Sequence, residues 1–174
     1  MIVILAGVSG SGKTTVGQLL ADRLGWPFAD GDSFHPPANV AKMSAGIPLT
    51  DDDRWPWLAA IGAWMDARIA VGGSGVMACS ALRRRYRDVL REGRTEVRLV
   101  FLEVSREIGL TRLRARPGHF FKARLLDSQF DALEPPAPAE GALVLAAGQS
   151  PDDLVAVIIS GLGLIAPGER PAEI

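Results

Sequence analysis

Short apolar runs alternate along the chain with longer stretches in which apolar residues recur at every third or fourth position. The first pattern predicts buried β-strands and the second predicts amphipathic helices. We expect strands at residues 1–6, 26–30, 76–79, 97–104 and 143–146. We expect helices at residues 13–24, 50–69, 83–91, 106–115, 119–130 and 150–164, with a further helix ending at residue 43. The proline-rich stretch 134–138 is expected to be an irregular loop.

Alternation of strands and helices is typical of a parallel sheet with helices packed on both faces. The chain has 174 residues, enough for one domain with a substantial core. No change in composition along it is long enough for an interdomain linker. We therefore expect one α/β domain with a five-stranded parallel sheet over residues 1–166, and a disordered tail over residues 167–174.

The first expected strand and helix are joined by a GxxxxGK[ST] motif, which runs Gly7-Val8-Ser9-Gly10-Ser11-Gly12-Lys13-Thr14. Its glycines allow successive N–H groups to face a phosphate chain, and the positive end of the following helix favours the same anion. The Lys13 ammonium can reach the β- and γ-phosphates, and the Thr14 hydroxyl can ligate Mg²⁺. The motif predicts a nucleoside triphosphate site on a three-layer P-loop NTPase fold. The expected nucleotide ligands in it are Gly7, Ser9, Gly10, Ser11, Gly12, Lys13, Thr14 and Thr15.

Composition restricts the partners and the location that we expect for the protein. The net charge is −1, so we expect neither a nucleic-acid partner nor a membrane surface. The single cysteine, Cys79, excludes an internal disulfide framework, and no apolar run approaches the length of a membrane span. Because Met1 leads directly into a core strand, we expect no cleaved leader and a cytoplasmic location.

Two absent sequence features restrict the class of P-loop protein. A GTPase switch needs an Asn-Lys-x-Asp segment to read guanine, and the chain contains none. A motor or AAA-type ATPase has an acid at a strand end for Mg²⁺, whereas the third expected strand ends at Cys79-Ser80. Small chains that lack both features are typically small-molecule kinases.

Two aspartates follow the second expected strand, at Asp30-Gly31-Asp32. Ligands of open α/β sheets bind at the carboxyl ends of the strands, so both carboxylates are expected beside the phosphate loop. A hydroxyl that attacks phosphorus must lose its proton, and a nearby carboxylate is the usual acceptor. We expect Asp32 to be this base, with Asp30 as the alternative or as a partner of Mg²⁺; turn-forming aspartates without a catalytic role are the competing interpretation.

The chain contains the stretches Asp30-Gly31-Asp32-Ser33-Phe34-His35-Pro36, Pro48-Leu49-Thr50-Asp51-Asp52-Asp53-Arg54, Cys79-Ser80-Ala81-Leu82 and Gly118-His119-Phe120-Phe121. Together they resemble the bacterial-type gluconokinase family. The match runs from about residue 2 to residue 130 and fades after residue 134. The resemblance implies a fold like that of nucleoside-monophosphate kinases and shikimate kinase, transfer of the γ-phosphate of MgATP to the 6-hydroxyl of D-gluconate, and a homodimer.

The resemblance also implies roles for residues on the acceptor side. Arg54 is similar in position to the acid-binding arginine of shikimate kinases, and a guanidinium suits a carboxylate; a surface pair with Asp51 or Asp52 is the alternative. The expected substrate ligands are Asp30, Asp32, His35, Arg54, Ser80, Ala81, Arg83 and Arg87. Of these, Arg87 is the one most expected to be structural. The expected metal ligands are Thr14 and Asp30.

Residues 112–130 lie where this fold carries a lid. Arginines that close over the phosphates stabilise the transferred charge and exclude water, and we expect Arg112 and Arg116 to do so. The expected catalytic residues are Lys13, Asp32 and Arg116. A solvated helix face is the alternative for these arginines. Two other functions remain open: a small-acid kinase of the shikimate kinase type, and a non-catalytic nucleotide-binding regulatory module.

Overall fold

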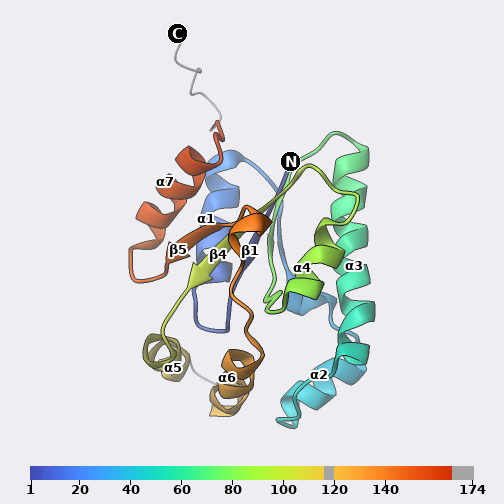
Figure 1. Ribbon diagram of the computed structural model, residues 1–174, viewed down its shortest axis with the longest axis vertical. Helices are drawn as coiled ribbons and strands as arrows, with labels where there is room; N and C mark the ends of the chain where they lie inside the picture. Colours follow the sequence, from blue (N-terminus) through green and yellow to red (C-terminus); the bar gives the residue numbers. More distant parts are fainter. Residues whose placement is uncertain (116–119, 166–174) are drawn as a thin grey trace.

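A computed structural model describes residues 1–115 and 120–165 and contains one parallel sheet (Figure 1). Its strands are β1 (Ile2–Ala6), β2 (Phe28–Asp30), β3 (Gly75–Ala78), β4 (Val97–Glu103) and β5 (Leu143–Ala146), in the order β2-β3-β1-β4-β5. All five strands were predicted from the apolar runs. Their order confirms an α/β fold in which β1, the strand before the phosphate loop, is central.

The helices agree with the predicted periodicity apart from their ends. They are α1 (Lys13–Leu24), α2 (Pro37–Ser44), α3 (Asp51–Ala70), α4 (Arg84–Arg91), α5 (Arg106–Arg114), α6 (Phe120–Ala132) and α7 (Pro151–Gly161), with 3₁₀ turns η1 (Gly31–Phe34) and η2 (Pro138–Glu140). The turn η2 corrects the expectation of an irregular stretch at its last residue, Pro138. Proline suits the first position of such a turn because the N–H that it lacks would have had no partner there. Arg116 and the expected tail, residues 167–174, lie outside the described residues.

The two faces of the sheet are covered by different helices. In Figure 1, α1 and α7 lie on one face, while α3 and α4 lie on the other. Side chains of β1 alternate between two hydrophobic clusters: Val3 and Leu5 belong to the cluster of α1 and α7, and Ile2 and Ile4 to the cluster of α3 and α4. Every residue of β1 is therefore buried, which explains why this strand reads as a continuous apolar run.

The carboxyl ends of the strands form the end of the molecule at which α2, α5 and α6 gather (Figure 1). The phosphate loop lies here and is packed tightly. A Cβ on Gly7, whose φ is 139°, would lie 2.6 Å from the Leu102 carbonyl oxygen, and one on Gly10, at φ 80°, would lie 2.7 Å from the Gly109 carbonyl oxygen. Both positions thus require glycine, because of space as well as backbone conformation. None of the helices in the described part of the chain is long and apolar enough to cross a membrane.

The start of α3 fixes the loop that precedes it. Thr50 and Asp53 form a reciprocal capping box, in which the Thr50 N–H donates to Asp53 Oδ2 at 2.9 Å. The Lys42 ammonium of α2 donates to Asp53 Oδ1 at 2.6 Å. These hydrogen bonds, of which the one from Lys42 has the largest effect, lower the pKa of Asp53 to about 2. The junction between α2 and α3 is therefore held by an ionised carboxylate.

Candidate active site

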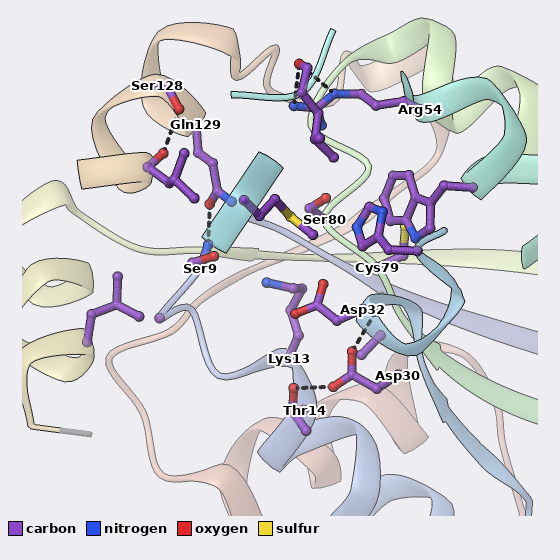
Figure 2. A pocket seen from close by; sticks show the side chains of 18 of the residues that line it. Ser9, Lys13, Thr14, Asp30, Asp32, Arg54, Cys79, Ser80, Ser128 and Gln129 are labelled. Carbon is purple, nitrogen blue, oxygen red and sulfur yellow. Dashed lines mark hydrogen bonds between the residues drawn. The ribbon is translucent and has the colours of Figure 1, made fainter. Parts of the chain in front are cut away.

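A pocket opens at the carboxyl ends of the strands, between the phosphate loop and the segment that joins β2 to α3 (Figure 2). The stretches that line it were separate predictions from the sequence. The lining includes Ser9, Gly10, Gly12, Lys13, Thr14, Asp30, Asp32, His35, Arg54, Trp57, Cys79, Ser80, Ser128 and Gln129. The fold thus brings the expected donor site and most of the expected acceptor residues into one cavity.

The helix that follows the phosphate loop begins differently from α3, α5 and α7. Those helices have Thr50, Ser105 and Ser150 at their N-caps, and each hydroxyl accepts a backbone N–H. The N-cap of α1 is Gly12, at φ 98°, which supplies no side-chain cap. The first N–H groups of α1 are left to a ligand, as expected for a phosphate site.

The two aspartates after β2 are held in different ways. The Thr14 hydroxyl donates to Asp30 Oδ2 at 2.9 Å, and the Asp32 N–H donates to Asp30 Oδ1 at 3.0 Å (Figure 2). Both oxygens of Asp30 are therefore engaged at the foot of the phosphate loop. Asp32 is exposed and lines the pocket.

His35 lies on the indole of Trp57, with ring centroids 4.5 Å apart and planes 11° from parallel. Trp57 is buried and donates from Nε1 to the Gly31 carbonyl at 2.7 Å, so it supports the turn that carries both aspartates. Burial lowers the pKa of His35, which favours a neutral imidazole. The Asn39 amide nitrogen, which also donates to the Asp53 carbonyl, lies 3.4 Å from His35 Nδ1. This geometry assigns the acceptor role to Nδ1 and the remaining proton to Nε2.

Arg54 lies at the far side of the pocket from the phosphate loop (Figure 2). Its Nε and Nη2 donate to the Leu49 carbonyl at 3.4 and 3.3 Å, and its guanidinium lies 5.5 Å from the centre of the Tyr86 ring. Arg54 also lines an adjacent hollow together with Arg83, Tyr86 and Asp51. We call these four residues, together with Arg85, which pairs with Asp51, the arginine rim.

Asp51 is the acidic member of the arginine rim. It accepts hydrogen bonds from the Tyr86 hydroxyl and, at 3.3 Å, from Arg83 Nη1, and it forms an ion pair with Arg85. The hydrogen bond from Tyr86, followed by the nearby arginines, lowers the pKa of Asp51. The rim therefore gathers three arginines around one ionised carboxylate, which leaves it positively charged.

Arg87 does not lie in the pocket, and its expected contact with substrate is corrected by the structure. Its side chain is 1% exposed and forms a bidentate pair with Glu140, at 2.6 and 2.9 Å. The remaining Nη1 donates to the Ala81 and Leu82 carbonyls at 3.1 Å each. The guanidinium is thus fully engaged inside the protein, where it fastens η2 to the loop after β3.

The loop after β3 carries the expected Ser80-Ala81 pair. Ser80 lines the pocket, and its carbonyl accepts the Gly7 N–H at 3.2 Å, which ties this loop to the phosphate loop. Ala81 is wholly buried at a φ of 37° and is not among the pocket-lining residues, so a side-chain contact with substrate does not fit its position. Cys79 is buried, and burial raises the pKa of its thiol to about 12, so the thiol is neutral.

Arg112 contacts the phosphate loop from α5. Its Nη1 lies 3.4 Å from the Gly10 carbonyl and 3.5 Å from the Ser11 carbonyl, and its Nη2 donates to Ala147. Together with Thr15 and Gln149 it lines a second hollow on the outer side of the loop. Arg112 thus lies between the loop and the segment after β5.

Gln129 and Trp57 are among the pocket-lining residues that were not predicted. Gln129 Oε1 accepts a hydrogen bond from the Ser9 N–H at 2.7 Å. The two residues are 120 apart in the sequence, so no local pattern predicts the contact. Trp57 packs in the hydrophobic cluster of α3, and its indole N–H adds a polar contact to the turn after β2.

The residues of the phosphate loop fit ATP with Mg²⁺. The Thr14 hydroxyl and the Asp30 carboxylate supply the oxygen donors that Mg²⁺ prefers, and this ion keeps several waters, so few protein ligands suffice. Within residues 1–115 and 120–165, no cluster of three or more His, Cys, Asp or Glu residues provides an alternative metal site. Among the same residues, Ser11 Oγ is a buried side-chain oxygen without a hydrogen-bond partner, which leaves a polar atom in the loop unsatisfied.

Comparison with known proteins identifies the family. The Shikimate kinase family model matches residues 9–129. The chain is 45% identical to a gluconokinase of Gluconobacter oxydans, over 90% of this chain and 88% of that protein, and 39% identical to the thermoresistant gluconokinase of Escherichia coli, over 97% and 95%. The crystal structure of a gluconokinase from Sinorhizobium meliloti superposes with a TM-score of 0.83 at 44% identity, covering 92% of this chain and 90% of that one. These identities and coverages, with the shared fold, show that the chain belongs to the gluconokinase family of shikimate-kinase-like P-loop kinases.

Proposed function

We propose that the protein transfers the γ-phosphoryl group of ATP to the 6-hydroxyl of D-gluconate, giving 6-phospho-D-gluconate and ADP. Membership of the gluconokinase family supports this reaction. The observation that carries it is that one pocket is lined by Lys13, Thr14 and Asp32 on one side and by Arg54 opposite (Figure 2). One small substrate can therefore contact the bound phosphate donor, the proton acceptor and the carboxylate ligand at the same time.

The phosphate loop binds the donor in this proposal. The N–H groups at the start of α1 and the Lys13 ammonium hold the phosphates, and Thr14 with Asp30 would hold Mg²⁺. When bound, the metal ion neutralises charge that develops on the β- and γ-phosphate oxygens. Asp30 is suited to this side of the site because Thr14 already holds one of its oxygens.

Asp32 is the base in this proposal. Its carboxylate takes the proton of the 6-hydroxyl as that oxygen forms a bond to phosphorus, and the bond from phosphorus to the bridging oxygen of ADP breaks. His35 lines the pocket, and its Nε2–H donates to a hydroxyl of the sugar chain. The Ser80 hydroxyl positions another.

The arginine rim binds the carboxylate of gluconate. Arg54 borders both the main pocket and the hollow that contains Arg83, so a substrate extended from Asp32 toward the rim reaches both guanidinium groups. Planar guanidinium groups bind carboxylates through paired hydrogen bonds. Arg112 and Arg116 stabilise the phosphates within a lid of residues 112–130, and the role of Arg116 rests on the family resemblance alone.

A coupled assay of ADP release tests the reaction. D-gluconate, shikimate, 2-keto-D-gluconate, D-glucose and a blank without acceptor are compared, and we expect turnover with gluconate above all others. Turnover with shikimate but not with gluconate would indicate a small-acid kinase of the shikimate kinase type. ATP binding without any turnover would indicate a regulatory module. The phosphorus NMR spectrum of the product identifies which hydroxyl is phosphorylated. A phosphate ester of a primary hydroxyl gives a triplet, because its phosphorus couples to the two protons of the CH2 group.

The resemblance further supports a homodimer that acts in the cytoplasm. Sedimentation velocity of the purified protein across a range of concentrations measures the assembly. A single species with the mass of one chain would contradict the dimer while leaving the reaction intact.

A further inference from the structure

One long-range hydrogen bond joins the phosphate loop to α6. The Ser9 N–H donates to Gln129 Oε1 at 2.7 Å, and Figure 2 shows Gln129 reaching down from α6 into the pocket to meet Ser9. Because an N–H group can only donate, its partner must be the amide oxygen, and this fixes which way the amide is turned. The Gln129 Nε2 hydrogens therefore remain on the side of the pocket.

This bond holds the middle of the phosphate loop. At the start of the loop, the Gly7 N–H donates to the Ser80 carbonyl at 3.2 Å. Toward its end, the Ser11 N–H donates to the Val8 carbonyl at 3.2 Å. Between them, Ser9 is held by a side chain from a distant helix. The position of the loop where the terminal phosphate must lie thus depends on α6.

The helix that carries Gln129 packs against α5. Arg106 of α5 forms ion pairs with Asp127, at 2.6 Å, and with Asp131, and the wholly buried Leu126 lies against Gly109. Gln129 lies between these anchored residues of α6. With α6 packed against α5 through Leu126, the Gln129 side chain can determine where the Ser9 backbone lies.

We infer that Gln129 is a positioning residue for phosphoryl transfer: it holds the Ser9 backbone through Oε1 and presents its Nε2–H to the space above Lys13 where the transferred group passes. The inference rests on the proposed kinase function for its consequence in turnover, but the contact with Ser9 stands apart from the identity of the acceptor. Its chemistry calls for a neutral amide, since a carboxylate would keep the acceptor for Ser9 but bring negative charge toward the phosphates.

The test separates these two parts with Gln129→Met and Gln129→Glu. Methionine preserves the length of the side chain without its polar atoms, whereas glutamate keeps an oxygen for the Ser9 N–H. Gln18→Met is the matched control, because Gln18 lies exposed on α1 and bonds Asp22. Hydrogen exchange at the Ser9 amide is measured in the ligand-free proteins, and kcat and both KM values are measured with ATP and gluconate.

We expect Gln129→Met to speed exchange at Ser9 by roughly tenfold or more, since its acceptor is lost, while Gln129→Glu keeps exchange slow. Both variants should lower kcat by about 10- to 100-fold, the cost of a misplaced reacting group, with the KM for gluconate changed less than about threefold. The control should match the parent protein in every measurement. Unchanged exchange at Ser9 in Gln129→Met, or an unchanged kcat in both variants, would overturn the inference. If the parent protein fails to turn over gluconate while exchange at Ser9 still depends on Gln129, the proposed substrate falls and the contact with the loop is upheld.

Discussion

The phosphate-loop end of the pocket and the arginine rim hold their polar groups in different ways. At the loop end, Thr14, Asp30 and Asp32 are linked by hydrogen bonds that involve backbone or short side chains. At the rim, the long side chains of Arg83 and Arg85 are held by one carboxylate, Asp51, and remain 33% and 48% exposed. The loop end is fixed by the fold, whereas the rim is held by partners that water or a ligand can replace.

This difference assigns different tasks to the two regions. Groups that act on the transition state must be in place beforehand, which the short contacts of the loop end provide. Groups that bind one end of a substrate can exchange partners, since an exposed ion pair contributes little to stability. A change at the loop end should therefore lower kcat, and a change at the rim should raise the KM for gluconate.

The largest effect is expected from Asp32→Asn. The amide cannot accept the proton of the attacking hydroxyl, so kcat should fall by about 10²- to 10⁴-fold. The affinity for ATP, measured by fluorescence titration, should stay within about threefold because Lys13 and Thr14 are unchanged. Asp30→Asn serves as the comparison, and full activity of Asp32→Asn with loss of activity in Asp30→Asn would exchange the roles of the two carboxylates.

The buried ion pair between Arg87 and Glu140 is tested by Arg87→Met. Removal of one partner leaves Glu140 charged and buried, which should lower the free energy of unfolding by about 3–5 kcal/mol. Arg83→Met, on the same side of the protein but with its partner Asp51 partly exposed, should cost less than about 1 kcal/mol. Urea unfolding of the two variants measures the difference. Equal losses of stability would show that burial does not distinguish these two arginines.

The rim itself is tested by Arg54→Lys. Lysine keeps the charge but lacks the planar pair of donors, so the KM for gluconate should rise by about tenfold while kcat changes little. The KM for ATP serves as an internal control, because Arg54 lies on the opposite side of the pocket from the loop. A fall in kcat with an unchanged KM for gluconate would place Arg54 with the loop end instead.

The same contrast decides how much the sequence alone could predict. The phosphate loop and the turn after β2 follow from contiguous residues and from the rule that strand ends meet at one edge, so the approach of Thr14 to Asp30 was within reach. The hydrogen bond between Ser9 and Gln129 could not be predicted from the sequence, because it joins residues 120 apart and depends on where α6 lies over the loop. Even the strand order, which places β1 at the centre, had to come from the structure.

The arginines near α4 show why charge pattern was insufficient at the rim. Arg83 and Arg87 are four residues apart, a spacing that would place both on one side of a helix. Arg83, however, is the N-cap residue with extended backbone, at φ −100° and ψ 147°, so its side chain does not follow the helix. Arg87 lies within the first turn and meets Glu140, 53 residues away, whose approach on η2 no local pattern announces.

The smallest predicted effect concerns His35, which lies between the two regions. Burial lowers its pKa in the folded protein, so between that value and the ordinary value of 6.5 the unfolded chain binds more protons than the folded one. Stability should therefore fall as the pH is lowered from 7 through this window. Asp51, Asp53 and Glu140 have lowered pKa values, so their contribution is lost as the pH falls from the ordinary carboxylate pKa toward the lowered values, at more acidic pH than the His35 window. Thermal unfolding midpoints between pH 7 and pH 5 should decline more steeply for the parent protein than for His35→Gln, which has no proton to gain. Parallel curves for the two proteins would mean that the stacked imidazole accepts its proton without leaving Trp57, and that the turn between the loop end and the rim tolerates a positive charge.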